Sequence, residues 1–240
     1  MLFKKDELSK FDFLSIGEFF LVLFLIILSM LFSLLALPNA LKKFFPVLFE
    51  SYYFAVFFFF LAMVLSFYVI YFFTCKRKNK SLSEGLFLKL PSRKTLLISF
   101  IIGMLMPLIT APLLFRFAPH TFYAGDLLKQ KGGMFFLFTC AMVAPLFEEV
   151  FYRGFIFPFF QSKLNSFWAI ILTSLFFALS HFMNVNAAYV LLSLFIFYGF
   201  VLTLLRYSTK SLIPSMVAHF VHNLTLIVCF LVMSKMKLLN

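Results

Sequence analysis

The sequence predicts an all-α membrane protein, a polytopic transmembrane helical bundle of about seven to eight spans. Of its 240 residues, 63% are hydrophobic and only 12% are charged, whereas a soluble domain is about 45–50% apolar and about 25% charged. The mean hydropathy is +1.04. The apolar stretches are continuous rather than alternating, which favours helices over a transmembrane barrel. This composition excludes a soluble single domain, a disordered chain and a coiled coil.

Seven apolar stretches come close to the roughly 20 residues that a helix needs to cross a bilayer. They cover residues 15–37, 47–74, 95–115, 134–157, 167–183, 187–206 and 211–234. The first stretch is too long for the core of a signal peptide, so we interpret it as a retained span. The two longest connections are predicted at 75–94 and 116–133. We expect two regions, with the first two spans and a basic cytoplasmic loop in 1–94 and a helical core in 95–240.

The charge of the chain is strongly basic, with 21 Lys and Arg against 9 Asp and Glu. These bases lie between the apolar spans, and their concentration in 75–94 predicts a cytoplasmic N-terminus. They are expected to contact anionic lipids of the bilayer. No compact basic face with interleaved aromatic residues is present, so nucleic acid is not an expected partner. The three cysteines form no CxxC pair, which disfavours a disulfide framework or a thiolate metal site.

The fourth span holds a pair of acidic residues, Glu148 and Glu149, followed by Arg153. Ionisable groups inside a bilayer are costly and indicate function by default. Glu149 and Arg153 are four residues apart, so they share a helix face and are expected to pair. Glu148 points to a different neighbour and is a candidate general base acting on water. Pro145 predicts a kink that admits water, and a salt-bridge cluster without chemistry is the alternative.

The last spans add histidines to this acidic pair. His181 lies near the end of the fifth span, where it is predicted to align or deprotonate a water molecule together with Glu148. His219 and Asn223 share a face of the last span and are candidate donors of an oxyanion hole. Alternatively, Glu148, His181 and His219 are the ligands of a catalytic zinc ion with an open position. No HExxH pair supports zinc, and the spacing leaves both interpretations open.

Three patterns occur in order, each in a separate apolar span: Glu148-Glu149-Val-Phe-Tyr-Arg153, Phe177-Ala-Leu-Ser-His181 and His219-Phe-Val-His222-Asn223. They resemble the motifs EExxxR, FxxxH and HxxxN of the CPBP family of intramembrane proteases. That family includes the type II CAAX prenyl endopeptidases and bacterial bacteriocin-processing and self-immunity relatives. The resemblance covers about residues 130–230 and makes 95–240 the expected catalytic core.

The resemblance implies an intramembrane endopeptidase that cuts a peptide bond near the membrane. Glu148 would activate the attacking water with His181 as its partner, while His219 and Asn223 would stabilise the oxyanion. The remaining motif residues would support the site: Glu149 and Arg153 by holding it together, and Phe177 by packing beneath His181. His222 differs from many relatives and is interpreted either as a further donor or as a residue facing another helix.

The resemblance also bears on cofactors, partners and location. The family is described as metalloproteases, yet a metal-free glutamate mechanism is argued for it too, so no cofactor is certain and zinc is one option. The expected substrate is a peptide or membrane protein, with a prenylated CAAX-type tail as one candidate and a bacteriocin-like peptide as another. A preference for Lys over Arg and a content of 41 Phe favour a bacterial origin, and hence the plasma (inner) membrane.

Two functions of other classes remain as alternatives at this stage. A non-enzymatic immunity or scaffold protein would reuse the same fold without cleaving a substrate. A proton-coupled transporter would use the glutamates and histidines as a proton relay. The sequence shows no internal repeat of the kind that many transporters contain, which disfavours the transporter.

Overall fold

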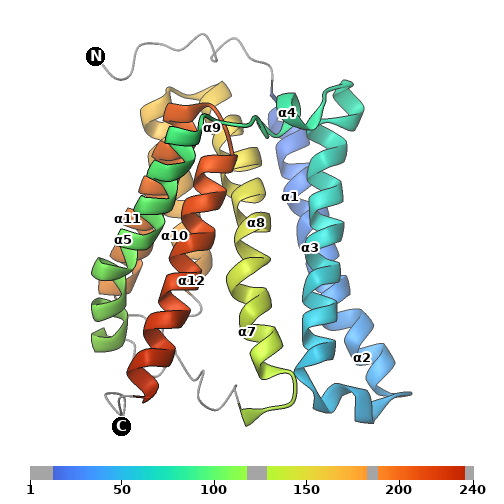
Figure 1. Ribbon diagram of the computed structural model, residues 1–240. Helices are drawn as coiled ribbons and strands as arrows, with labels where there is room; N and C mark the ends of the chain where they lie inside the picture. The colour runs from blue at the N-terminus through green and yellow to red at the C-terminus, as the bar shows by residue number, and fades with distance from the viewer. Residues whose placement is uncertain (1–12, 118–128, 183–188, 236–240) are drawn as a thin grey trace.

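The computed structural model describes residues 13–117, 129–182 and 189–235 of the chain, and every regular element in these residues is helical (Figure 1). In order, the elements are α1 (Ile16–Leu31), the π-helix η2 (Phe32–Ala36), α2 (Leu37–Lys42), the 3-10 helix η3 (Pro46–Glu50), α3 (Tyr52–Thr74), the 3-10 helix η4 (Lys76–Lys78), α4 (Leu82–Gly85), α5 (Arg93–Phe117), α7 (Gly133–Met142), α8 (Ala144–Glu149), the π-helix η5 (Val150–Ile156), α9 (Phe157–Lys163), α10 (Ser166–Phe182), α11 (Tyr189–Thr209) and α12 (Ile213–Lys235). The predicted all-α fold class is confirmed.

Several of these helices are long and apolar enough to span a membrane. Within the described residues, five stretches meet that description: Ile16–Lys42, Tyr52–Lys78, Arg93–Leu113, Gly133–Lys163 and Leu192–Thr209. Two shorter apolar helices, Ser166–His181 and Ile213–Cys229, complete the set found in this part of the chain. Each predicted apolar stretch therefore coincides with a helix or a run of helices, and the chain is an integral membrane protein. Most of the predicted loop 116–133 lies outside the described residues.

The fourth span is a run of four helical segments, α7, α8, η5 and α9, rather than one regular helix. Its first interruption is at Val143, two residues before Pro145, which is the second residue of α8. Its second irregularity is the π-helix η5, which ends where Pro158 opens α9. Proline has no backbone N–H and therefore removes one bond of the regular helical pattern at each place. The irregular backbone flanks the acidic pair on both sides, and π-helical turns are frequent at functional sites.

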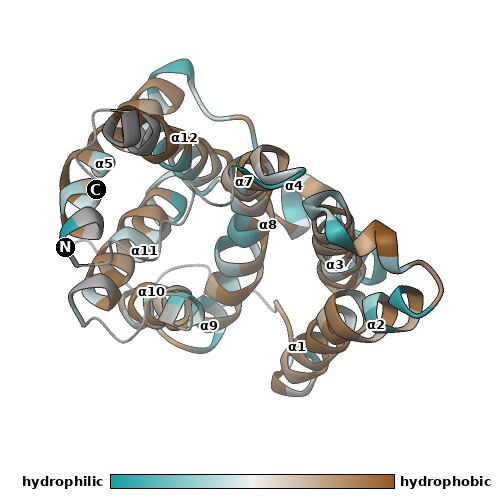
Figure 2. Cartoon of the chain, turned by 90° about the horizontal axis from the view of Figure 1, so that it is seen from below, coloured by the Kyte–Doolittle hydropathy of each residue, from teal (hydrophilic) through white to brown (hydrophobic). Residues whose placement is uncertain are grey.

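This central run lies between two groups of helices. Seen from below in Figure 2, α1, α2 and α3 lie on one side of α7 and α8, while α5, α10, α11 and α12 lie on the other. The first span packs directly against the run, because the Phe19 ring stacks on Phe159 with 3.7 Å between centroids. The division into 1–94 and 95–240 stays a prediction.

Two glycines allow close packing of helices α5, α10, α11 and α12. A Cβ atom built on Gly103 of α5 would lie 2.5 Å from the carbonyl oxygen of Ala218 on α12. A Cβ atom on Gly199 of α11 would lie 3.2 Å from the Cα atom of Ser174 on α10 and 3.1 Å from the Phe177 ring. The absence of a side chain at both positions lets the four helices approach one another closely.

Candidate active site

The acidic pair and His181 lie at the same depth in the bundle because of how α9 and α10 connect. The two helices are antiparallel and joined by a short turn. Glu148 lies 15 residues before Lys163, the end of α9, and His181 lies 15 residues after Ser166, the start of α10. At 1.5 Å per residue, both lie about 22 Å from that turn. The two side chains are therefore at a similar level along the bundle.

Glu149 and Arg153 form the predicted ion pair, and it is fully buried. The Arg153 Nη1 atom donates to Glu149 Oε1 over 2.7 Å, and both side chains are 0% exposed. Arg153 also donates to α11, through Nη2 to the Gly199 carbonyl at 3.1 Å and through Nε to Thr203 Oγ1 at 3.3 Å. The guanidinium carbon lies 4.6 Å from the centre of the Phe177 ring. The pair thereby ties the central run to α10 and α11.

The same Glu149 oxygen binds His219 on α12. Its Oε1 atom lies 2.9 Å from His219 Nδ1, and an ionised carboxylate only accepts hydrogen bonds, so Nδ1 carries the proton. The other ring nitrogen, Nε2, faces Glu148 Oε2 at 3.8 Å. Glu149 thus orients His219 toward Glu148. This contact had no signal in the sequence, because 70 residues separate the two side chains.

His181 is oriented toward Glu148 in the same manner. Its Nδ1 atom lies 2.8 Å from the carbonyl oxygen of Phe177, and a carbonyl accepts only, so Nδ1–H donates. The Nε2 atom then faces Glu148 Oε2 at 3.9 Å. The Phe177 ring lies against the imidazole, with 4.6 Å between centroids, which confirms the predicted packing. The Phe195 ring stacks on His181 at 4.7 Å.

Glu148 Oε2 is therefore the point on which both histidines converge. This oxygen is buried and has no hydrogen-bond partner among the described residues, whereas the whole Glu148 side chain is 26% exposed. A buried polar atom without a partner is costly and is commonly satisfied by water or ligand. The arrangement can hold a water molecule between a carboxylate and two imidazoles.

Asn223 and His222 form a separate pair next to this centre. Asn223 is half-buried, and its Oδ1 atom lies 3.1 Å from His222 Nδ1. His222 is buried, and its Nε2 atom lies 3.1 Å from Thr110 Oγ1 on α5. Asn223 follows His219 by one helical turn, so it shares that face of α12. His222 in turn connects α12 to a helix outside the three motifs.

Two buried residues outside the three motifs contact these histidines. Tyr198 of α11 stacks on His222 with 4.1 Å between centroids and meets the His219 ring edge-on at 5.3 Å. Thr110 of α5 binds His222 as described. The sequence signal for both is a polar group within an apolar span, which needs a partner once it is buried.

A metal ion at this point would have to be held by Glu148, His181 and His219. Ligand atoms around a tetrahedral zinc ion lie about 3.3 Å apart, given bonds of about 2.0–2.1 Å. The facing atoms here lie 3.8 and 3.9 Å apart, and no group of three His, Cys, Asp or Glu in the described part of the chain has metal-binding geometry. Zinc stays an untested alternative, and no step below involves it.

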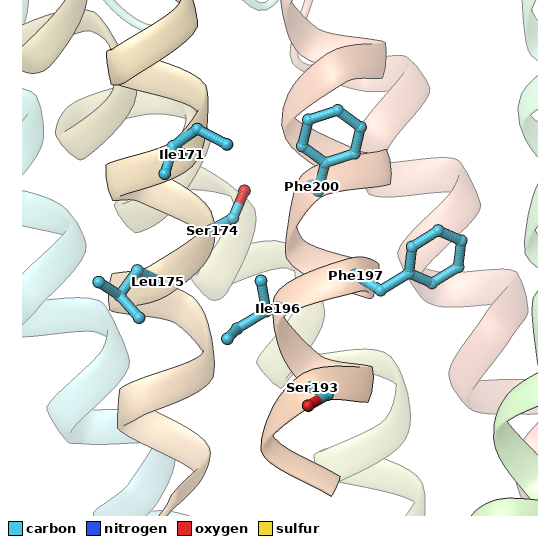
Figure 3. A pocket seen from close by; sticks show the side chains of 7 residues that line it. All are labelled: Ile171, Ser174, Leu175, Ser193, Ile196, Phe197 and Phe200. Atoms are coloured by element: carbon cyan, nitrogen blue, oxygen red, sulfur yellow. The ribbon is translucent and has the colours of Figure 1, made fainter. Parts of the chain in front are cut away.

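The hollow between α10 and α11 lies apart from this centre. It has a volume of about 410 Å³ and is lined by Ile171, Ser174, Leu175, Ser193, Ile196, Phe197 and Phe200 (Figure 3). Its surface is apolar except for two serine hydroxyls, and none of its lining residues is titratable. The hollow therefore lacks the ionisable groups that gather around Glu148.

Comparisons with known proteins identify the part of the chain that contains this centre. Residues 130–225 match the family model described as type II CAAX prenyl endopeptidase Rce1-like. No curated protein and no solved structure matches the chain. The matched residues include all three motifs and exclude α1, α3 and α5. The resemblance to the CPBP group is confirmed for this part of the chain, because residues 130–225 are similar to the Rce1-like family of type II CAAX prenyl endopeptidases.

Proposed function

We propose that the chain is an intramembrane endopeptidase in which Glu148 is the general base that activates water. One observation carries the proposal: the Nε2 atoms of His181 and His219 both face the same Glu148 oxygen, at 3.9 and 3.8 Å. The Nδ1 atom of each imidazole forms a hydrogen bond away from Glu148, to the Phe177 carbonyl for His181 and to the Glu149 carboxylate for His219. Three groups held in this way converge on a space suited to one reacting oxygen atom.

In the first step, a water molecule lies between Glu148 and His181. Glu148 removes one water proton, and the Nε2 lone pair of His181 accepts a hydrogen bond from the other. The hydroxide oxygen attacks the peptide carbonyl carbon, and the carbonyl oxygen becomes the oxyanion of a tetrahedral intermediate. Phe177 supports this step by fixing His181 through its carbonyl group and its ring.

In the second step, His219 and Asn223 stabilise the oxyanion. A doubly protonated His219 donates Nδ1–H to Glu149 and Nε2–H to the oxyanion. The Asn223 amide, one turn away, adds a second donor. Glu148 then returns its proton to the leaving nitrogen as the C–N bond breaks, which releases an acid and an amine.

The proposed substrate is a peptide or membrane protein whose scissile bond reaches the level of Glu148. The Rce1-like match favours a C-terminal CAAX-type tail, prenylated or not, and processing of a bacteriocin-like peptide is a further option. We place the protein in a bacterial plasma membrane with its N-terminus in the cytoplasm, on the basis of its Lys and Arg distribution.

The test is cleavage of labelled peptides, with and without a prenylated tail, by the purified full-length protein in lipid nanodiscs. Wild-type protein should cleave at least one of them, and Glu148→Gln and His181→Ala should not. Glu50→Gln is the matched control, because Glu50 is exposed on η3. Full activity of Glu148→Gln would contradict the proposal. Proton uptake coupled to a substrate would favour the transporter, and complementation of a deletion strain by Glu148→Gln would favour the immunity protein.

A further inference from the structure

A buried tyrosine hydroxyl next to the proposed oxyanion site has no partner in the described residues. Tyr198 is 4% exposed, and its hydroxyl oxygen accepts and donates no hydrogen bond among them. Burying a hydroxyl without a partner is unfavourable. We therefore expect this hydroxyl to form a hydrogen bond with a bound water molecule or a substrate group.

The surroundings of Tyr198 place it against the histidines of the site. Its ring meets His219 edge-on at 5.3 Å and 87°, and it stacks on His222 at 4.1 Å. The Phe177 ring lies 6.0 Å away on a third side. These contacts fix the plane of the ring. The hydroxyl is also close enough to Glu149, Arg153 and Glu148 to interact with their charges.

The polar groups around this position are rich in acceptors and poor in free donors. Glu148 Oε2 and Glu149 Oε2 are both buried without a partner, and carboxylates only accept. The Nδ1 protons of His181 and His219 are already directed away from the centre. The Arg153 nitrogens donate to Glu149, Gly199 and Thr203. The Tyr198 hydroxyl is therefore a neutral donor that adds to the His219 and Asn223 donors of the proposed function.

We propose that the Tyr198 hydroxyl donates a hydrogen bond to the oxyanion of the tetrahedral intermediate, beside His219. The hydroxyl keeps its proton throughout, so the reaction balance of the proposed hydrolysis is unchanged. A donor that is fixed by ring packing before the reaction needs no reorganisation when charge develops. This role rests on the proposed function, which it extends by a residue outside the three motifs.

The test is Tyr198→Phe, which removes one oxygen atom and keeps every ring contact. We expect kcat to fall by about 10²-fold, as for other oxyanion donors, with KM changed less than threefold. The unfolding temperature should be unchanged or higher, because a buried hydroxyl without a partner is lost. Tyr71→Phe on α3 is the control, since Tyr71 is partly buried beside Phe67 and belongs to none of the three motifs.

The outcomes separate this role from the proposed function. If the wild type cleaves, Glu148→Gln does not, and Tyr198→Phe cleaves as fast as the wild type, the role of Tyr198 is overturned and the proposed function stands. A lower unfolding temperature of Tyr198→Phe that accounts for its lost activity would also overturn it, in favour of packing. Absence of cleavage by the wild type across the peptide panel, or cleavage by Glu148→Gln, would overturn both proposals.

Discussion

Replacing Glu149 by Gln separates what this residue does for stability from what it does for catalysis. The substitution keeps the shape of the side chain but removes a charge that is 0% exposed and bonded to both Arg153 and His219. Arg153 then stays buried with no compensating carboxylate. Breaking one partner out of a buried ion pair costs about 3–5 kcal/mol, a large part of the about 5–15 kcal/mol that stabilises a typical protein.

The catalytic effect of the same change acts through His219. A neutral amide in place of the carboxylate binds the His219 Nδ1–H group more weakly and therefore orients His219 less firmly toward Glu148. In other hydrolases, loss of the carboxylate that orients a catalytic histidine lowers kcat by about 10⁴-fold. We expect a loss of about 10²- to 10⁴-fold here, because Asn223 still contributes.

A double substitution distinguishes the two effects. In Glu149→Gln with Arg153→Met, the unpaired charge is gone, and an apolar replacement of a buried pair is often neutral for stability. The free energy of unfolding, measured by denaturant titration in detergent, should recover most of the loss. Peptide cleavage should stay low, because His219 still lacks its carboxylate. A single variant as stable as wild type, or a double variant with wild-type kcat, would refute the reasoning.

Three further predictions follow from the packing and chemistry of the site. Gly199→Leu should push α10 and α11 apart, because even a Cβ atom would lie 3.1 Å from the Phe177 ring. It should lower stability by about 1–3 kcal/mol and kcat with it, and unchanged thermal unfolding would contradict this. Thr110→Val should remove the contact with His222 and lower both kcat, several-fold, and the unfolding temperature, because the buried His222 Nε2 atom loses its partner, whereas full activity would show that α5 does not support the site. Activity of metal-stripped protein should survive a strong chelator, and loss that zinc restores would contradict the metal-free mechanism.

Much of the fold could be predicted because hydropathy reports helices directly. The irregular fourth span could not be predicted in the same way. The sequence placed its end near residue 157, but the run continues as α9 through Lys163, since a proline in the first turn of a helix is tolerated there. Pro145 indicated a kink. The π-helix η5 has no such local signal, because it depends on the backbone hydrogen bonds of the whole fourth span.

The site was predicted in composition but only partly in geometry. The pairing of Glu149 with Arg153 follows from local helical spacing and is confirmed. The bond from Glu149 to His219 joins two helices, and spacing within one helix cannot report it. Asn223 was expected beside His219, yet the hydrogen bond that the structure gives it is to His222. Whether it also donates to an oxyanion stays a prediction. Tyr198 lies on a helix with no motif, so only its contacts identify it.

The most direct test of the account is the cleavage rate of Glu148→Gln against wild type and Glu50→Gln, in nanodiscs and with metal removed. The account predicts cleavage by wild type and by Glu50→Gln, and no detectable cleavage by a folded Glu148→Gln. Equal cleavage by all three proteins would contradict the assignment of Glu148 as the base.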